Sequence, residues 1–253
     1  MNILVVNDDG IETAGIKALA KALSTVADVY VCAPASQQSG KSQSISIKTE
    51  VFVEKVDFPF AKEALSTTGT PADCTKIGLQ FFADEGHPID MVYSGINHGS
   101  NLGRDTLYSG TVGAAMEGAV SGHHSVAVSV DSHQASHFDV ACQLALDVID
   151  FVLKETSTDT VLNINVPDLP REEIRGLKYT VLGGRYYIDS FKPRDGGGYM
   201  LDGEPGDLSE LSEDYDVKAV TEGYASITPL HFDYTQYDMM EKVAGCGLTI
   251  EGK

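Results

Sequence analysis

Two adjacent carboxylates, Asp8 and Asp9, follow an apolar run at residues 2–6, with only Asn7 between them and the run. Such a run is typical of a strand buried on both faces of a parallel sheet. Paired carboxylates at its end repel each other and lose hydration unless a cation or hydrogen-bond donors compensate. Because ligands of open α/β sheets bind beyond the carboxyl ends of the strands, we expect Asp8 and Asp9 to hold a divalent metal ion. The alternative is a solvated acidic turn around Asp9 and Gly10.

Two further loops bring oxygen donors to the same edge of the predicted sheet. Ser39 follows a second predicted strand at residues 29–33, and Asn97 follows a third at residues 90–93. Carboxylate, hydroxyl and amide oxygens suit Mg²⁺, Mn²⁺ or Ca²⁺. Taken singly, Ser39 and Asn97 also fit ordinary turns, so the metal hypothesis depends on the three loops lying together.

The segment at residues 108–111 has the composition of an anion site. Ser109 or Gly110 can cap a helix of small residues, and the free N–H groups at a helix N-terminus bind phosphate. The same small residues also permit close packing of helix on sheet, so both readings stay open. His98 is a candidate proton donor to a leaving group, and a surface residue that only hydrogen-bonds is the alternative.

Strand and helix patterns alternate as far as residue 166. Helical spacing at residues 11–24 links the first two strands into a βαβ unit, so these strands should be parallel. Further strands are predicted at residues 65–68, 125–130 and 161–166, helices at 70–82, 110–118 and 138–153, and a half-exposed ribbon at 43–56. The pattern predicts an α/β fold with a doubly wound, mostly parallel sheet and helices on both faces.

The alternation stops near residue 176. A short strand there is followed by a glycine- and acid-rich stretch through residue 222 and by a final strand at 224–230. We therefore divide the chain into a core at residues 1–175 and an extended β/irregular region at residues 176–253. The stretch at 183–223 is too long and polar to fold on itself, which predicts a homodimer or a larger assembly such as a homotetramer.

The composition limits the partners. The chain has 253 residues and a formal net charge of −19, which argues against a nucleic-acid duplex or an anionic membrane. To bind to this acidic protein, a small anionic ligand would need a metal ion or backbone amides at its binding site. The four cysteines form no C-x-x-C pair, and the apolar runs are too short for a membrane span or a signal peptide, so we expect a cytoplasmic protein.

Several of these segments, in this order and over nearly the whole chain, resemble the SurE family of survival-protein nucleotidases. The matching segments are Asn7-Asp8-Asp9-Gly10, Ser39-Gly40, Gly69-Thr70-Pro71-Ala72-Asp73-Cys74, Ser94-Gly95-Ile96-Asn97, Asn101, Tyr108-Ser109-Gly110-Thr111, Asn163-Ile164-Asn165-Val166-Pro167 and Ile227-Thr228-Pro229-Leu230. The resemblance implies a Rossmann-like core whose C-terminal extension is exchanged between subunits.

The resemblance also implies a metal-dependent phosphatase that acts on nucleoside monophosphates at the 5′ or 3′ position. By matching position, Asp8, Asp9, Ser39 and Asn97 are the implied ligands of one Mg²⁺ or Mn²⁺ ion. Asn101 and the turn Ser109-Gly110-Thr111 form the implied phosphate side. We expect hydrolysis by a metal-activated water that Asp8 or Asp9 orients or deprotonates. The alternatives are an aspartyl-phosphate intermediate on Asp8 and a nucleotide-binding regulatory module without turnover.

Overall fold

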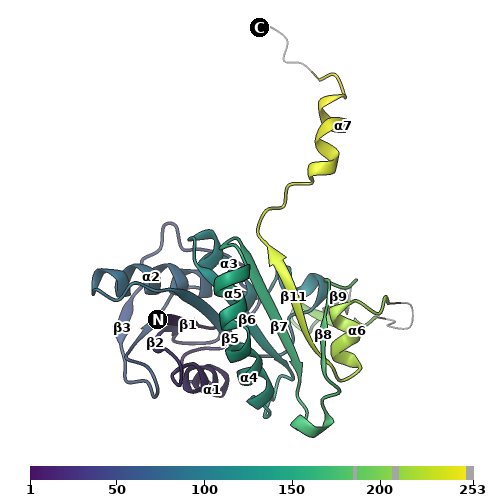
Figure 1. Ribbon diagram of the computed structural model, residues 1–253. Coiled ribbons are helices and arrows are strands. Elements are labelled where there is room, and N and C mark those ends of the chain that lie inside the picture. Colours follow the sequence, from purple (N-terminus) through teal and green to yellow (C-terminus); the bar gives the residue numbers. More distant parts are fainter. Residues whose placement is uncertain (185–186, 207–210, 249–253) are drawn as a thin grey trace, which may run out of the picture.

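A computed structural model describes residues 1–184, 187–206 and 211–248 of the chain. Its centre is a nine-stranded sheet in the order β3-β4-β2-β1-β5-β6-β7-β11-β8 (Figure 1). From β4 to β7 neighbouring strands are parallel, whereas β3 and β11 run antiparallel to β4 and β7. The predicted α/β fold with a mostly parallel sheet is thereby confirmed.

The main-sheet strands are β1 (Asn2–Val6), β2 (Asp28–Pro34), β3 (Val53–Lys55), β4 (Glu63–Thr67), β5 (Met91–His98), β6 (His124–Asp131), β7 (Thr160–Pro167), β8 (Leu177–Tyr179) and β11 (Ala225–His231). The helices are α1 (Ala14–Leu23), α2 (Pro71–Asp84), α3 (Gly110–Val120), α4 (Asp139–Asp147), α5 (Ile149–Glu155), α6 (Asp216–Thr221) and α7 (Met240–Ala244). Short 3₁₀ helices are η1 (Gly103–Leu107), η2 (Arg171–Glu173) and η3 (Tyr237–Met239). None of the described helices is long and apolar enough to cross a bilayer.

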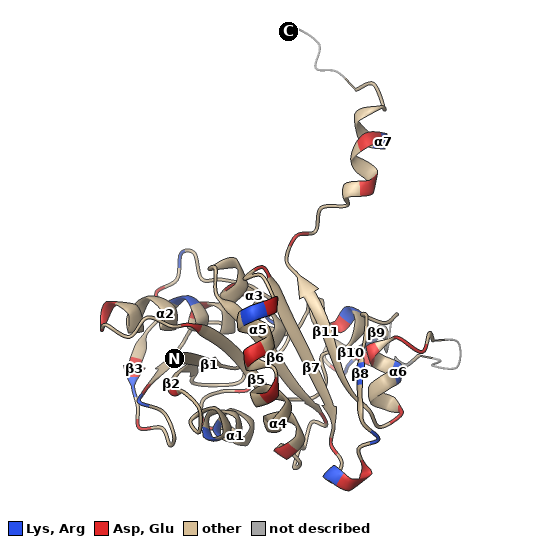
Figure 2. Ribbon diagram, viewed as in Figure 1, with Lys and Arg blue, Asp and Glu red and all other residues tan. Residues whose placement is uncertain are grey.

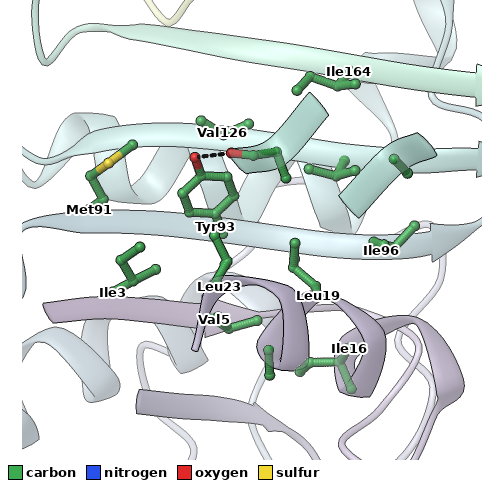
Figure 3. Close-up of a cluster of buried hydrophobic side chains, with 14 of the residues drawn as sticks. Ile3, Val5, Ile16, Leu19, Leu23, Met91, Tyr93, Ile96, Val126 and Ile164 are labelled. Carbon is green, nitrogen blue, oxygen red and sulfur yellow. Dashed lines mark hydrogen bonds between the residues drawn. The ribbon is translucent and has the colours of Figure 1, made fainter. Parts of the chain in front are cut away.

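Alternate residues of the central strands supply two hydrophobic cores. Ile3 and Val5 of β1 face a core shared with α1 and α4, and Leu4 faces a core shared with α2. Figure 3 shows the first core, in which the hydroxyl of buried Tyr93 donates to the carbonyl oxygen of Ala145 at 2.8 Å. Helices therefore cover both faces and hold the carboxyl ends of β1, β2 and β5 at one edge.

Two segments differ from their predictions. In the alternating stretch at 43–56 only β3 forms a strand, because Ser46 instead donates its backbone N–H and its hydroxyl to Asp73 in the first turn of α2. The helix predicted at 138–153 is divided at Val148 into α4 and α5. Neither difference moves the loops at the carboxyl edge.

The chain beyond residue 176 is more regular than predicted. β8 and β11 extend the main sheet, and β9 (Tyr187–Pro193) pairs antiparallel with β10 (Tyr199–Pro205) in a separate hairpin. Residues 185–186 and 207–210 of this stretch lie outside the described residues. After β11 the chain leaves the body of the molecule, and α7 projects away from it (Figure 1). The domain boundary near residue 176 remains a prediction.

Candidate active site

The loop after β1 places the two carboxylates. The side-chain nitrogen of Asn7 donates to the carbonyl oxygen of Gly10 at 2.9 Å and to the Thr13 hydroxyl at 3.1 Å, which closes the turn around Asp8 and Asp9. Gly10 has a φ of +108°, a conformation that few residues other than glycine adopt. The turn is therefore fixed by its own residues before any ligand binds.

Asp8 is buried against the N-terminus of α3. Its Oδ1 accepts a hydrogen bond from the Thr111 hydroxyl at 2.5 Å, and a methyl group added to Gly110 would lie 2.8 Å from its Oδ2. Burial raises the pKa of Asp8 from 3.8 to about 6, against the opposing hydrogen bond from Thr111 and with a further upward contribution from the charge of Asp9. The protein therefore compensates the ionised form of Asp8 only in part.

Asp9, in the loop after β1, and Asn97, near the end of β5, each use part of their side chain in hydrogen bonds within the protein. The backbone N–H of His98 donates to Asp9 Oδ2 at 2.9 Å, and His98 Nδ1 lies 3.0 Å from the same oxygen. Asn97 donates its amide nitrogen to the carbonyl oxygen of Gly99 at 2.7 Å, which leaves its amide oxygen for another partner. Both residues thus keep an oxygen that their hydrogen bonds do not use.

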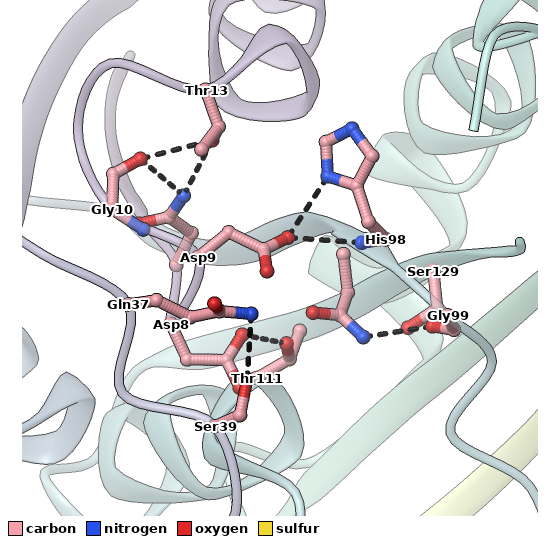
Figure 4. Close-up of polar contacts among 12 residues, drawn as sticks. Asp8, Asp9, Gly10, Thr13, Gln37, Ser39, His98, Gly99, Thr111 and Ser129 are labelled. Carbon is pink, nitrogen blue, oxygen red and sulfur yellow. Dashed lines mark hydrogen bonds and ion pairs between the residues drawn. The ribbon is translucent and has the colours of Figure 1, made fainter. Parts of the chain in front are cut away.

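The loop after β2 crosses this edge and carries Ser39. The backbone N–H of Gln38 donates to the carbonyl oxygen of Asp8 at 2.7 Å, and that of Ser42 donates to the carbonyl oxygen of Tyr108 at 3.0 Å. Between these anchors Ser39 is exposed, and its hydroxyl accepts a hydrogen bond from the Gln37 side chain at 2.9 Å. Figure 4 shows Ser39 beside Asp8 and Thr111, with Asp9 and His98 on the other side of the same space.

Ser109 is the N-cap of α3, one of the two caps that the sequence offered. Its side-chain oxygen accepts a hydrogen bond from the backbone N–H of Val112 at 3.1 Å. The Thr111 hydroxyl donates to Asp8, so it links the predicted phosphate side to the predicted metal side. The small residues also pack closely, since a methyl group on Gly113 would lie 2.3 Å from the carbonyl oxygen of Ser42.

Asn101 is held by partners to which sequence reasoning assigned no role. Its backbone N–H donates to Asn165 Oδ1 at 2.7 Å, and its carbonyl oxygen accepts from the side chains of Asn163 and Asn165. Its own side chain donates to the hydroxyl of Ser129 at 2.7 Å. The signal in the sequence was two asparagines, spaced i and i+2, within an otherwise apolar strand.

A buried carboxylate in the C-terminal region, Asp216, also escaped the sequence reasoning. It accepts backbone hydrogen bonds from Gly103, Gly183 and Val217 at 2.7–2.8 Å, so it ties the loop after Asn101 to the chain beyond β8. Burial raises the pKa of Asp216, and these three N–H groups oppose the shift.

The structure brings the predicted residues to one edge of the sheet, from the loops after β1, β2 and β5 and from the start of α3. Among the described residues no group of three or more His, Cys, Asp or Glu side chains could hold a metal ion. The donor set of two carboxylates, a hydroxyl and an amide is of the hard-oxygen kind that suits Mg²⁺ or Mn²⁺. Each ligand role remains a prediction.

Comparison with known proteins places this arrangement in a family. Residues 3–189 match the family model described as survival protein SurE. The 5′-nucleotidase SurE of Heliobacterium modesticaldum is 41% identical, over 96% of this chain and 91% of the relative, and that of Legionella pneumophila is 41% identical, over 96% of each. The crystal structure of the SurE protein from Aquifex aeolicus superposes with a TM-score of 0.83 at 38% identity, covering 96% of this chain and 98% of that one. The chain therefore belongs to the SurE family.

Proposed function

We propose that this protein is a metal-dependent phosphatase that hydrolyses nucleoside 5′- and 3′-monophosphates to nucleoside and phosphate. The relatives at about 40% identity are named 5′-nucleotidase SurE. The observation that carries the proposal is the contact of buried Asp8 with the N-terminal turn of α3, through Thr111 and Gly110. This contact puts a pair of carboxylates next to backbone N–H groups suited to phosphate.

The residues at this edge fit one divalent metal ion. Asp8 is buried, with its pKa raised to about 6, beside a second carboxylate on Asp9. A divalent cation held by Asp8, Asp9, Ser39 and Asn97 would compensate both negative charges. When bound, Mg²⁺ or Mn²⁺ lowers the pKa of a water molecule and neutralises charge on the phosphate.

The chain's own groups supply the remaining functions. Asp8 or Asp9 orients the attacking water and accepts its proton. The backbone N–H groups of the Ser109-Gly110-Thr111 turn and the Ser109 hydroxyl, with Asn101, hold the phosphate oxygens, whereas the Thr111 hydroxyl donates to Asp8. Lys and Arg are distributed over many elements of the chain rather than gathered on one (Figure 2), so we infer that phosphate binding depends on these local donors.

Phosphate release from a panel of nucleoside 5′- and 3′-monophosphates tests the function. We expect turnover with Mg²⁺ or Mn²⁺ and none after EDTA treatment. Nucleotide binding without release of phosphate under any metal would instead favour a regulatory module. A phosphoryl group trapped on Asp8 during turnover would replace direct hydrolysis with an aspartyl-phosphate mechanism.

We propose further that the protein is a homodimer or homotetramer in which the C-terminal region is exchanged between subunits and packs on a core. Large apolar side chains stand exposed on the β9–β10 hairpin and on the segment around α7. They are 67% exposed at Phe191, 70% at Tyr199, 81% at Tyr234 and 89% at Leu248. Isolated exposed apolar residues are common, but a series along the hairpin and along the segment around α7 is typical of surface covered in an assembly.

Light scattering at micromolar concentration should therefore give at least twice the mass of one chain. A variant that ends at residue 233, and so lacks the segment around α7, should shift towards a lower mass. A full-length protein that is monomeric at this concentration would contradict the proposed assembly.

The four cysteines are free thiols: Cys32 and Cys74 are buried, Cys142 is half-buried and Cys246 is exposed. Burial raises the pKa of Cys32 and raises that of Cys142 to about 11, which makes these two thiols unreactive. Free thiols suit a reducing compartment, and we propose the cytoplasm as the location of the enzyme.

A further inference from the structure

One oxygen of Asp9 is held twice by a single residue. Asp9 Oδ2 accepts the backbone N–H of His98 at 2.9 Å and lies 3.0 Å from His98 Nδ1 (Figure 4). The side chain of Asp9 is 7% exposed and that of His98 is 20% exposed, so water competes little for these bonds. The other oxygen of Asp9 takes no part in this contact.

A bulge in β5 precedes the end of the strand that carries Asn97 and His98. The pairing of β5 with β6 shifts register between Ser94 and Asn97, and beyond this shift Asn97 and His98 pair regularly with β6. Asn97 and His98 both make their side-chain hydrogen bonds at the carboxyl edge. Bulges of this kind are common next to active sites.

The ring of His98 is itself held in place. Phe138 packs against it edge to face, with ring centroids 5.5 Å apart and an interplanar angle of 79°. Because a carboxylate only accepts hydrogen bonds, the contact with Asp9 places a proton on Nδ1. Nε2 takes no part in the contact with Asp9.

The two carboxylates are fixed in the same manner. Thr111 holds Oδ1 of Asp8, and His98 holds Oδ2 of Asp9. In each case one oxygen is bound by the protein and the second remains for a cation. Hydrogen bonds of this kind orient metal ligands and commonly contribute 10- to 100-fold, as an order of magnitude, to metal affinity.

We propose that His98 is a positioning residue that holds Asp9 in the orientation required for metal binding. The inference rests on the proposed metal site at Asp8 and Asp9. It assigns His98 to ligand orientation rather than to proton donation to the leaving group.

Titration of the full-length protein with Mn²⁺, followed by calorimetry and by the Mn²⁺ electron spin resonance signal, tests this role. His98→Ala should weaken Mn²⁺ binding by about 10- to 100-fold. His98→Asn places an amide nitrogen near the position of Nδ1 and should restore most of the affinity. His98→Gln, whose amide reaches the position of Nε2 instead, should bind as weakly as the alanine variant.

Kinetics separate orientation from proton donation. For the His98→Ala variant, raising the Mn²⁺ concentration should recover most of kcat, because the defect lies in metal affinity. Unchanged Mn²⁺ affinity with a kcat that stays low at saturating metal would overturn the proposal in favour of a proton donor. If the wild-type protein binds no Mn²⁺, the metal site and this inference are both overturned. If the wild type binds Mn²⁺ and all three variants bind it with the wild-type affinity, only the role of His98 is overturned.

Discussion

Replacing Asp8 with asparagine is expected to lower phosphate release by several orders of magnitude and to make the metal-free protein more stable. The activity falls because Asp8 contributes a charged oxygen to the metal site, and a neutral amide binds a hard cation poorly. The fold persists because an asparagine oxygen can still accept the hydrogen bond from the Thr111 hydroxyl. Colorimetric phosphate release and thermal unfolding in EDTA measure the two effects.

The gain in stability should depend on pH. The folded-state pKa of Asp8, about 6, lies above the ordinary value of 3.8 that applies in the unfolded chain, so folding favours the neutral acid. This contribution to stability is fully present below pH 3.8 and is lost as the pH rises through about 6. Above that pH the ionised group costs the metal-free wild type on the order of 3 kcal/mol. The advantage of Asp8→Asn should therefore grow across this window and level off above it.

A second buried carboxylate provides the matched control. Asp216 accepts three backbone N–H groups, and an asparagine offers only one oxygen to replace two. Asp216→Asn should therefore lose stability where Asp8→Asn gains it. Mn²⁺ should stabilise the wild type and leave Asp8→Asn unchanged. Wild-type turnover by Asp8→Asn would remove this carboxylate from the mechanism.

The sheet could be predicted because its strands are buried on both faces. Residues 3–6 and 29–33 are continuously apolar, and in a chain that alternates strand and helix patterns such short apolar runs are typical of buried parallel strands. The region after residue 176 could not be predicted in the same way. β9 and β10 pair with each other outside the main sheet and expose side chains such as Phe191, so no face imposes a regular apolar pattern on them.

The loops of the site could be placed at one edge because the carboxyl ends of parallel strands lie at the same edge of a sheet. Their finer contacts could not be predicted, since each depends on residues far apart in the chain. Asn101 meets Asn163 and Asn165 only through the pairing of β6 with β7, and Thr111 meets Asp8 only because α3 packs across the sheet. Polar residues inside an apolar strand indicate that such contacts exist, but the sequence does not show which residues are their partners.

Gly113→Ala is expected to reduce metal affinity and activity while leaving the protein folded. The added methyl group would lie 2.3 Å from the carbonyl oxygen of Ser42 and 2.9 Å from the backbone nitrogen of Gln43. Backbone atoms cannot rotate away, so the loop that carries Ser39 must move outward. Alanine favours the helix by about 1 kcal/mol over glycine, which offsets part of the loss in packing.

The displacement should appear in three measurements. Mn²⁺ affinity and kcat/KM should fall by roughly 10- to 100-fold, because Ser39 moves relative to Asp8. Trypsin should cleave faster after Lys41, which is exposed in the same loop. Val120→Ala, at an exposed position of the same helix, should change none of these. Faster cleavage together with wild-type metal affinity would show that the loop moves without affecting metal binding. Ser39 would then have to be removed from the ligand set, which would leave Asp8, Asp9 and Asn97 as the protein ligands.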